Sequence, residues 1–429
     1  MSAPTVPHDY VGDQPAAKTA TRTWPAKAYR VLKAVASLRI TVTLFSLSMA
    51  LVFLGTLGMT QDSIENTVKT YFRTWIAWID LQGVVEFGKV FCGVDKDAHV
   101  SLKVPFPGGY TIGWLMFFNL LAAHAVRFKL TWKRSGIFLL HAGVIVLLAG
   151  EFLTGQYQVE TKMIIKEGES ADFASSLTET EFVAIDSSDP AVDQVLSVPG
   201  DMVAEATGWF THPDLPFEFR VVEYFPNSDI VDLESGAPNK ADRGMGLRIV
   251  LEQKPKVKGT DASGTINYPA AYLELRDRES RPLGTYLFTT MLKRAQPVTV
   301  GGKTYDVAFR FKRAYKPYQV HLIKAEHENF AGTSTPKDFA STVLVKDPEL
   351  GEHGPIRIWM NHPMTYRGET YYQSQMDTDR NTGVKTTGLQ VVRNPAWTAP
   401  YLACGMVALG MSVHFLIRLL AFLQRGAGK

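Results

Sequence analysis

One apolar run constrains this chain more than any other feature of its sequence. Residues 133–153 read KRSGIFLLHAGVIVLLAGEFL, with two basic residues at the front and one histidine, His141, inside the run. The run is too long and too uniformly apolar for an amphipathic surface helix, and it matches the roughly 17–25 residues of a membrane-spanning helix. An ionisable side chain is costly inside such a helix, so His141 is a candidate functional residue.

Three further apolar blocks have the same character, and together they predict a membrane bundle of four transmembrane helices. The predicted spans are residues 40–59, 110–126, 136–153 and 399–420. Each span is long enough to cross about 30 Å of hydrocarbon at about 1.5 Å per residue. The chain has 429 residues, which leaves room for a large soluble part as well.

Basic residues gather at one end of all four predicted spans. Because basic loops stay in the cytoplasm, we expect residues 1–39 (a polar tail and a basic surface helix), 127–135 and 421–429 to be cytoplasmic. Residues 60–109 and 154–398 then lie on the periplasmic side of a bacterial inner membrane. The basic residues are Lys18, Arg22, Lys27, Arg30, Lys33, Arg39, Arg127, Lys129, Lys133, Arg134, Arg418, Arg425 and Lys429.

The two external segments differ in their patterns. Residues 60–109 carry apolar side chains at helical spacing, which predicts short amphipathic helices at the outer membrane interface. Their expected anchors are Trp75, Trp78, Phe87 and Phe91.

Residues 154–398 instead alternate apolar and polar side chains in many short runs, and Gly301 and Gly302 separate two of these runs as a hairpin turn would. This pattern predicts a large all-β domain, either a sandwich or an open barrel, of about ten strands.

Three histidines lie inside the predicted spans, all in the cytoplasmic half. Counted at 1.5 Å per residue, His124, His414 and His141 lie about 4.5, about 6 and about 10 Å from the inner boundary. His124 and His414 can be explained as polar residues at helix ends that reach the headgroups. His141 is either a buried histidine bonded to a neighbour or an axial ligand of a metal or haem. Its second ligand must then come from another helix or another protein.

A second group of candidate residues lies near the end of the β-rich segment, where residues 361–377 read NHPMTYRGETYYQSQMD. One interpretation is structural, with two turns and a strand. The other is a surface that contacts a flat ligand or a partner. The residues of this candidate surface are His362, Tyr366, Arg367, Tyr371 and Tyr372.

Missing motifs exclude several classes of protein. The sequence has no glycine-rich phosphate loop, no H-E-x-x-H and no G-x-S-x-G. Cys92 and Cys404 are the two cysteines, and they form no C-x-x-C, so no thiol-redox motif or cysteine zinc site is predicted. The net charge of +3 argues neither for nor against nucleic acid, and we expect no such partner.

Four segments carry a resemblance to a known family. They are SLRITVTLFSLSMALVFLGTL, WKRSGIFLLHAGVIVLLAG with His141 and Gly143, MNHPMTYRGETYYQSQMD, and GLQVVRNPAWTAPYLACGMVALGMSVHF. Together, and in the order of three spans, a large external domain and one more span, they resemble the ResB/CcsB family of cytochrome c biogenesis proteins. This family is one partner in the haem-attachment route called System II. Residues 160–350 carry no motif of the family.

The resemblance implies a function and a set of partners. The chain would be a subunit, non-catalytic or co-catalytic, of a membrane cytochrome c synthase (haem lyase) complex with a CcsA/ResC-type haem-handling protein. The complex would move haem across the membrane and present it for thioether attachment to apocytochrome c. A thiol-reducing redox protein and membrane lipid are the other expected partners.

The resemblance also implies a transient haem b, shared with the partner subunit and ligated by one histidine from each chain. His141 matches the family's membrane histidine, with His124 as the runner-up. Two alternatives remain at this stage. The chain could be a scaffold or apocytochrome chaperone that binds no haem and docks the haem-handling partner, or it could be an unrelated membrane-anchored sensor.

Overall fold

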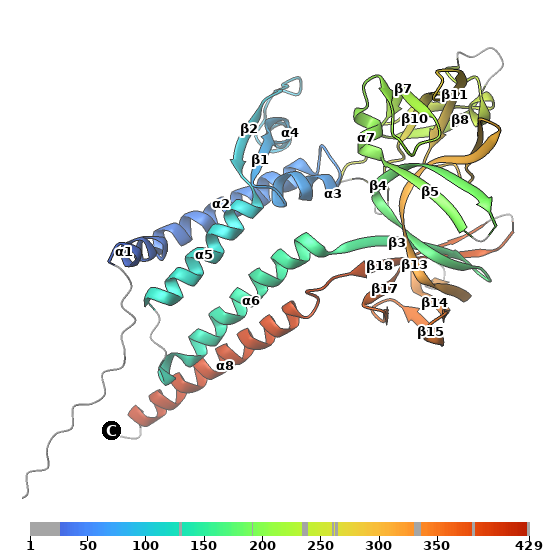
Figure 1. Ribbon diagram of the computed structural model, residues 1–429. Coiled ribbons are helices and arrows are strands. Elements are labelled where there is room, and N and C mark those ends of the chain that lie inside the picture. The colour runs from blue at the N-terminus through green and yellow to red at the C-terminus, as the bar shows by residue number, and fades with distance from the viewer. Residues whose placement is uncertain are drawn as a thin grey trace, which may run out of the picture.

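The computed structural model describes residues 26–127, 131–190, 192–233, 239–259, 261, 265–329, 336–379 and 382–426. The predicted tail at residues 1–25 lies outside the described residues, and so do Lys18, Arg22, Lys129 and Lys429. Figure 1 shows long helices at one end of the molecule and a β domain at the other. In the described part, four helices are long and apolar enough to cross a membrane: α2 (Leu38–Gly58), α5 (Gly109–Arg127), α6 (Ser135–Tyr157) and α8 (Ala399–Gly426).

The long helices form two pairs, α2 with α5 and α6 with α8 (Figure 1). The second pair is in close contact because Gly136, Gly143 and Gly150 recur every seven residues on the face of α6 toward α8. A methyl group added to Gly143 would lie 2.9 Å from the carbonyl oxygen of Ala403 on α8. Small residues of this kind let two helix backbones approach each other in a membrane.

A buried asparagine joins a short basic helix, α1 (Ala26–Val35), to the first helix pair. Asn119 of α5 donates from Nδ2 to the Val35 carbonyl at 2.6 Å, and its Oδ1 accepts from the Thr41 hydroxyl at 2.7 Å. These bonds satisfy backbone and side-chain groups at the break between α1 and α2, where Ser37 caps α2. The predicted basic helix before the first span is therefore fixed against α5.

The segment after α2 forms a small unit beside the C-terminal half of that helix (Figure 1). Its elements are α3 (Ile64–Thr67), a π-helical turn (Val68–Phe72), β1 (Ile76–Asp80), α4 (Leu81–Phe91) and β2 (Lys103–Pro107). β1 and β2 pair antiparallel. The sequence predicted only helices here, because the apolar runs of both strands are too short to show a period of two.

The β domain contains sixteen described strands, more than the predicted ten or so. All of their strand pairs are antiparallel. The strands are β3 (Val159–Lys166), β4 (Ser170–Asp189), β5 (Val192–Pro199), β6 (Trp209–Phe210), β7 (Glu218–Phe225), β8 (Ser228–Asp232), β9 (Ile249–Gln253), β10 (Ala270–Arg276), β11 (Pro282–Thr289), β12 (Gln296–Val300), β13 (Lys303–Asn329), β14 (Pro336–Asp347), β15 (Gly351–Trp359), β16 (Met364–Tyr366), β17 (Glu369–Thr378) and β18 (Lys385–Arg393). The β domain also contains α7 (Gly200–Glu205) and a 3-10 turn (Gly244–Leu247), and another 3-10 turn (Trp132–Arg134) precedes α6.

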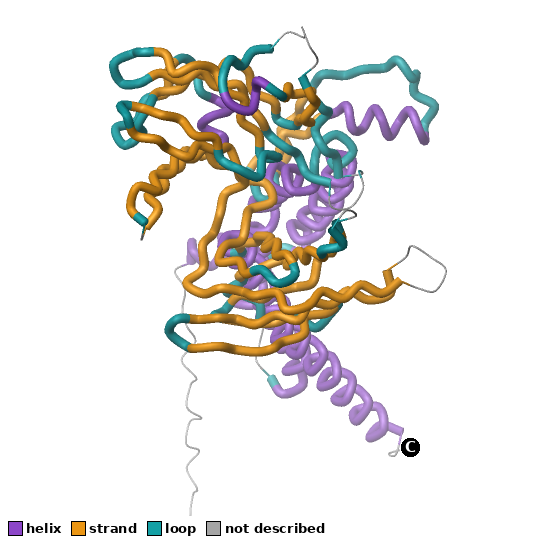
Figure 2. The backbone as a smooth tube through the Cα atoms, turned by 90° about the vertical axis from the view of Figure 1, so that its right-hand side faces the viewer, coloured by secondary structure: helices purple, strands orange, loops and turns teal. Residues whose placement is uncertain are grey.

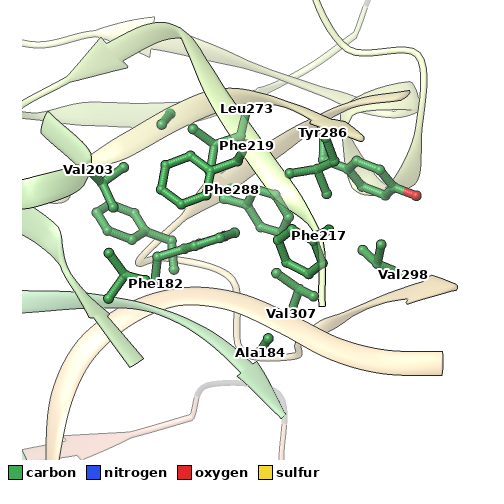
Figure 3. Packing of buried hydrophobic residues seen from close by; sticks show 14 of the residues in the cluster. Phe182, Ala184, Val203, Phe217, Phe219, Leu273, Tyr286, Phe288, Val298 and Val307 are labelled. Atoms are coloured by element: carbon green, nitrogen blue, oxygen red, sulfur yellow. The ribbon is translucent and has the colours of Figure 1, made fainter. Parts of the chain in front are cut away.

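Two long strands, β4 and β13, run through both lobes of this domain (Figures 1 and 2). In the lobe away from α6 and α8, they pack with β5 and β12 against a second sheet of order β11-β10-β7-β6. Phenylalanines fill the space between these sheets (Figure 3), with the ring of Phe182 5.2 Å from those of Phe219 and Phe288. This lobe is a sandwich.

The other, near lobe joins α6 through β3 and α8 through β18, and it encloses a second core. Its strands follow the order β15-β14-β13-β4-β3-β18-β17-β16. Side chains from all eight of these strands line the second core, and Ser341 of β14 donates to Gln373 of β17 at 2.6 Å, so the sheet curls into an open barrel. An isolated bridge between Trp359 and His362 forms the turn from β15 to β16. The prediction offered a sandwich or an open barrel as alternatives, and the domain contains one of each kind.

Candidate functional site

His124 of α5 and His141 of α6 lie in contact. Their ring centroids are 5.0 Å apart, and the ring planes meet at 79°, an edge-to-face arrangement. The structure thus brings together the two histidines that the sequence ranked first and second. His414 is not part of this contact, because its backbone on α8 packs against Gly136 and its ring contacts Phe415.

The glycine face of α6 determines where His141 points. His141 is five residues after Gly136 and two before Gly143, so at about 100° per residue it lies about 140–160° around the helix from both. Because the glycines face α8, His141 faces away from α8 and toward α5. Both histidines are partly exposed in the isolated chain.

A backbone hydrogen bond fixes the tautomer of His124. Its Nδ1 lies 2.9 Å from the Leu120 carbonyl oxygen one turn earlier in α5. A carbonyl oxygen only accepts, so Nδ1 carries the proton and the neutral ring has its lone pair on Nε2. Histidines that ligate metals commonly hold their other ring nitrogen in this way. The ring of Phe138, 6.2 Å away, forms an apolar neighbour.

The donor set of this pair suits haem better than a bare metal ion. The described residues contain no group of three or more His, Cys, Asp or Glu side chains that could hold a metal ion. Two imidazoles do not complete the coordination of such an ion, whereas haem iron takes only one or two axial ligands from protein. The two rings touch, however, so no flat macrocycle fits between them. In this arrangement one histidine at most is an axial ligand of a given haem.

The surroundings of the pair are apolar, with positive charge beyond one end. The described basic residues that the sequence assigned to the cytoplasm lie at the end of the helices farthest from the β domain (Figure 1). His124 is three residues before the end of α5, and this end lies on the same side. The residues at this basic end are Lys27, Arg30, Lys33, Arg39, Lys133, Arg134, Arg418 and Arg425.

The second predicted group lies in the near lobe of the β domain, and most of it is structural. Tyr371 is fully buried, which places its ring in the core and not on a surface. Its hydroxyl is 2.6 Å from the Tyr318 hydroxyl and donates to Glu369 at 3.2 Å. Glu369 also accepts from the Lys316 ammonium at 2.6 Å. The network joins β13 to β17 and leaves a buried carboxylate well satisfied.

Tyr366 and Arg367 hold a second buried carboxylate, that of Asp347. The Tyr366 hydroxyl donates to it at 2.7 Å, and Arg367 donates from Nε and Nη2 at 2.7 and 2.9 Å. Burial alone would raise the pKa of Asp347, but these donors, together with the Glu349 N–H, lower the pKa to about 2. Arg367 adopts a positive φ of 45° to make this contact at the turn.

His362, Arg367 and Tyr372 are the exposed members of the group, and the guanidinium of Arg367 is bonded to Asp347. The His362 ring stacks on the Trp359 indole, with centroids 3.7 Å apart and planes at 8°. Contact of this exposed pair with a ligand or a partner stays a prediction. Sequence reasoning missed Lys316, Tyr318 and Asp347, because each lies 19 or more positions along the chain from the side chains it bonds, and only the fold brings them together.

These features define a protein with four apolar helices, a large antiparallel β domain and a histidine pair between two of the helices. Among curated proteins, the chain is similar to Protein NrfI of Wolinella succinogenes, with 24% identity over 296 residues. The match covers 68% of this chain and 28% of NrfI, so the chain spans less than a third of that relative's length. No family model matches the chain.

Proposed function

We propose that this chain is a subunit of a membrane cytochrome c synthase complex, which moves haem across the membrane and presents it for attachment to apocytochrome c. The contact between His124 and His141 carries the proposal, because two imidazoles between apolar helices are costly unless they have a role. The likeness to NrfI supports a role in cytochrome c biogenesis, as do the four segments that resemble the ResB/CcsB family.

In this proposal the basic end of the helices faces the cytoplasm of a bacterial inner membrane, and the β domain lies in the periplasm. His141 ligates haem iron, and His124 lies beside it as the second candidate ligand. Haem, when bound, supplies an iron that accepts a neutral imidazole and vinyl groups that become the thioethers. The chain itself supplies the imidazole, apolar helix surfaces that exclude water, and positive charge at the end where haem would enter. The other axial ligand comes from a CcsA/ResC-type partner.

The test is an absorption spectrum of the complex purified from cells that also make the partner and a cytochrome c. We expect His141→Ala to lose most of the haem absorbance and of the holocytochrome c, with a normal amount of the chain in the membrane. Added imidazole should restore part of both, because it can fill the position of the missing side chain. His124→Ala should shift the spectrum or lower its intensity.

His414→Ala is the matched control, since His414 lies in the same half of the helices but outside the contact. It should behave as wild type. Wild-type haem absorbance in the double variant His124→Ala, His141→Ala would refute the proposal.

A second candidate function is a scaffold or apocytochrome chaperone that binds no haem. The stacked and partly exposed pair of Trp359 and His362 on the β domain is the observation that favours it. In that case substitution of His141 would leave the spectrum unchanged. Substitution of His362 and Tyr372, which are exposed, would instead weaken apocytochrome binding in a pull-down experiment.

A further inference from the structure

The small unit formed by β1, α4 and β2 exposes many large apolar side chains. Five of its largest exposed side chains are more than half exposed, and isolated apolar groups on a soluble surface seldom gather in this way. These side chains are Trp75, Ile76, Trp78, Val90 and Phe91. We propose that this unit is embedded in the leaflet of the bilayer at the outer end of α2, with lipid as its partner.

The strand β1 separates its two faces completely. Ala77 and Ile79 are buried in a small core with Leu51 of α2 and Ile112 of α5. The residues between them in the chain point to the other side of the sheet, because successive side chains of a strand alternate. Trp78 therefore lies on the outward face of β1. Tryptophan is enriched at the membrane–water interface, where its ring sits among the headgroups.

Helix α4 is divided less strictly, since the exposed Val90 lies about 40° around the helix from Glu86. Gln82, Glu86 and Lys89 form a polar ridge, with Glu86 accepting from Gln82 at 2.6 Å and from Lys89 at 3.0 Å. Val84 and Phe91 are exposed and lie about 140–160° around the helix from Glu86 at 100° per residue. A helix with one bonded polar ridge and one bare apolar face is the kind that lies in a membrane interface.

The position of α4 along α2 indicates lipid rather than water around the apolar face. Phe87 of α4 contacts Phe53 of α2 edge-to-face at 5.5 Å, and Gly83 packs against the Leu57 carbonyl. Phe53 is five residues before the end of α2, which is about 7.5 Å along the helix axis. The apolar face of an interfacial helix is buried about 5–10 Å into the boundary between headgroups and acyl chains. The depth of Phe53 along α2 falls in this range.

The apolar surface also continues from this unit onto α2 without a break. Phe53 itself is about half exposed, as is its neighbour Val52, although Phe53 touches α4. Both residues belong to a helix that is apolar enough to cross a membrane. The lipid that covers this side of α2 therefore meets the side of α4 next to it.

The experiment measures where labels on α4 lie in a bilayer that contains no partner protein. The chain has two cysteines, so Cys92→Ala with Cys404→Ala gives a cysteine-free background. Val84→Cys and Glu86→Cys place a nitroxide spin label on opposite faces of the same helix. The full-length chain is reconstituted in phosphatidylcholine and phosphatidylglycerol bilayers, and collisions with oxygen are compared with collisions with a water-soluble nickel chelate.

Two reference positions calibrate the measurement. Cys404, kept alone by Cys92→Ala, is exposed on α8 five residues from its start and reports the membrane. Val192→Cys, on β5, is exposed on the β domain and reports water. We expect the label at position 84 to give an oxygen-to-nickel collision ratio several-fold above that at position 192 and close to that at position 404. The ratio at position 86 should be close to that at position 192. Equal, water-like ratios at 84 and 86 would overturn the proposal, including the case in which a partner protein covers this face instead of lipid.

Discussion

A methyl group added to Gly136 of α6 would lie 2.5 Å from the backbone nitrogen of His414 on α8. This separation is shorter than any ordinary contact, so the two helix backbones touch at a point that only glycine permits. The same face of α6 carries Gly143 and Gly150. The close approach along this face holds α6 at one rotation about its axis, and this rotation turns His141 toward His124.

Gly143→Ala should therefore destabilise the α6–α8 pair. The added methyl group would meet the Val407 side chain at 2.8 Å and the Ala403 carbonyl oxygen at 2.9 Å, so the helices must separate. Overpacking of this kind costs roughly 1–3 kcal/mol. We expect a lower unfolding temperature in detergent, followed by tryptophan fluorescence.

Gly405→Ala, on α8, is the control for this prediction. A methyl group added there meets nothing within 4 Å, and alanine has the higher helix propensity. This variant should unfold at the wild-type temperature or above it. If Gly143→Ala also unfolds at the wild-type temperature or above it, the close packing along this face does not stabilise the α6–α8 pair.

The stability of the β domain should depend on pH through Asp347. The pKa of this carboxyl falls from an ordinary value of 3.8 to about 2 in the folded chain. A depressed folded pKa adds stability that is complete above the unfolded pKa and is lost as pH falls through the folded pKa. The unfolding temperature should thus fall between about pH 4 and about pH 2 in wild type. Asp347→Asn should unfold at a lower temperature at neutral pH and show a weaker dependence in this window.

Glu349→Gln provides the comparison for Asp347, because Glu349 also accepts from Arg367 at 2.7 Å but its side chain is largely exposed. Exposed ion pairs contribute little, so this variant should follow the wild-type curve. Identical pH dependence in Asp347→Asn and wild type would show that the Asp347 carboxylate does not stabilise the folded state in this way.

The stacked rings of Trp359 and His362 should be coupled energetically, since they lie face to face across the turn between β15 and β16. Aromatic pairs contribute about 0.5–1.5 kcal/mol beyond the area they bury. We expect a coupling of this size from a double-mutant cycle of Trp359→Ala, His362→Ala and the double variant, measured by denaturant unfolding. Additive effects would mean that the stack does not stabilise this turn.

Much of the helical part could be predicted because its signals are local. Four apolar runs and the basic residues at their ends are properties of neighbouring positions. Trp75 and Trp78 were misplaced on helices, since a spacing of three suits a helix and the strand β1, which contains Trp78 and directly follows Trp75, is only five residues long. Tyr371 was placed on a candidate surface, because its hydroxyl partner Tyr318 on β13 lies more than 50 positions away and only the fold shows that both are buried.

The sequence by itself determined which segments are apolar helices, that the segment between α6 and α8 is all-β, and that His141 is an ionisable residue in an apolar helix. Hydropathy and side-chain periodicity are carried by residues close together in the chain, so they can be read without a structure. Only the tertiary structure decided that His124 touches His141, that Asp347 lies under Arg367, and that α4 lies against α2. Those contacts join residues on separate elements that are far apart in the chain. The histidine contact also depends on the glycines of α6, which have no side chain and so let α8 approach closely.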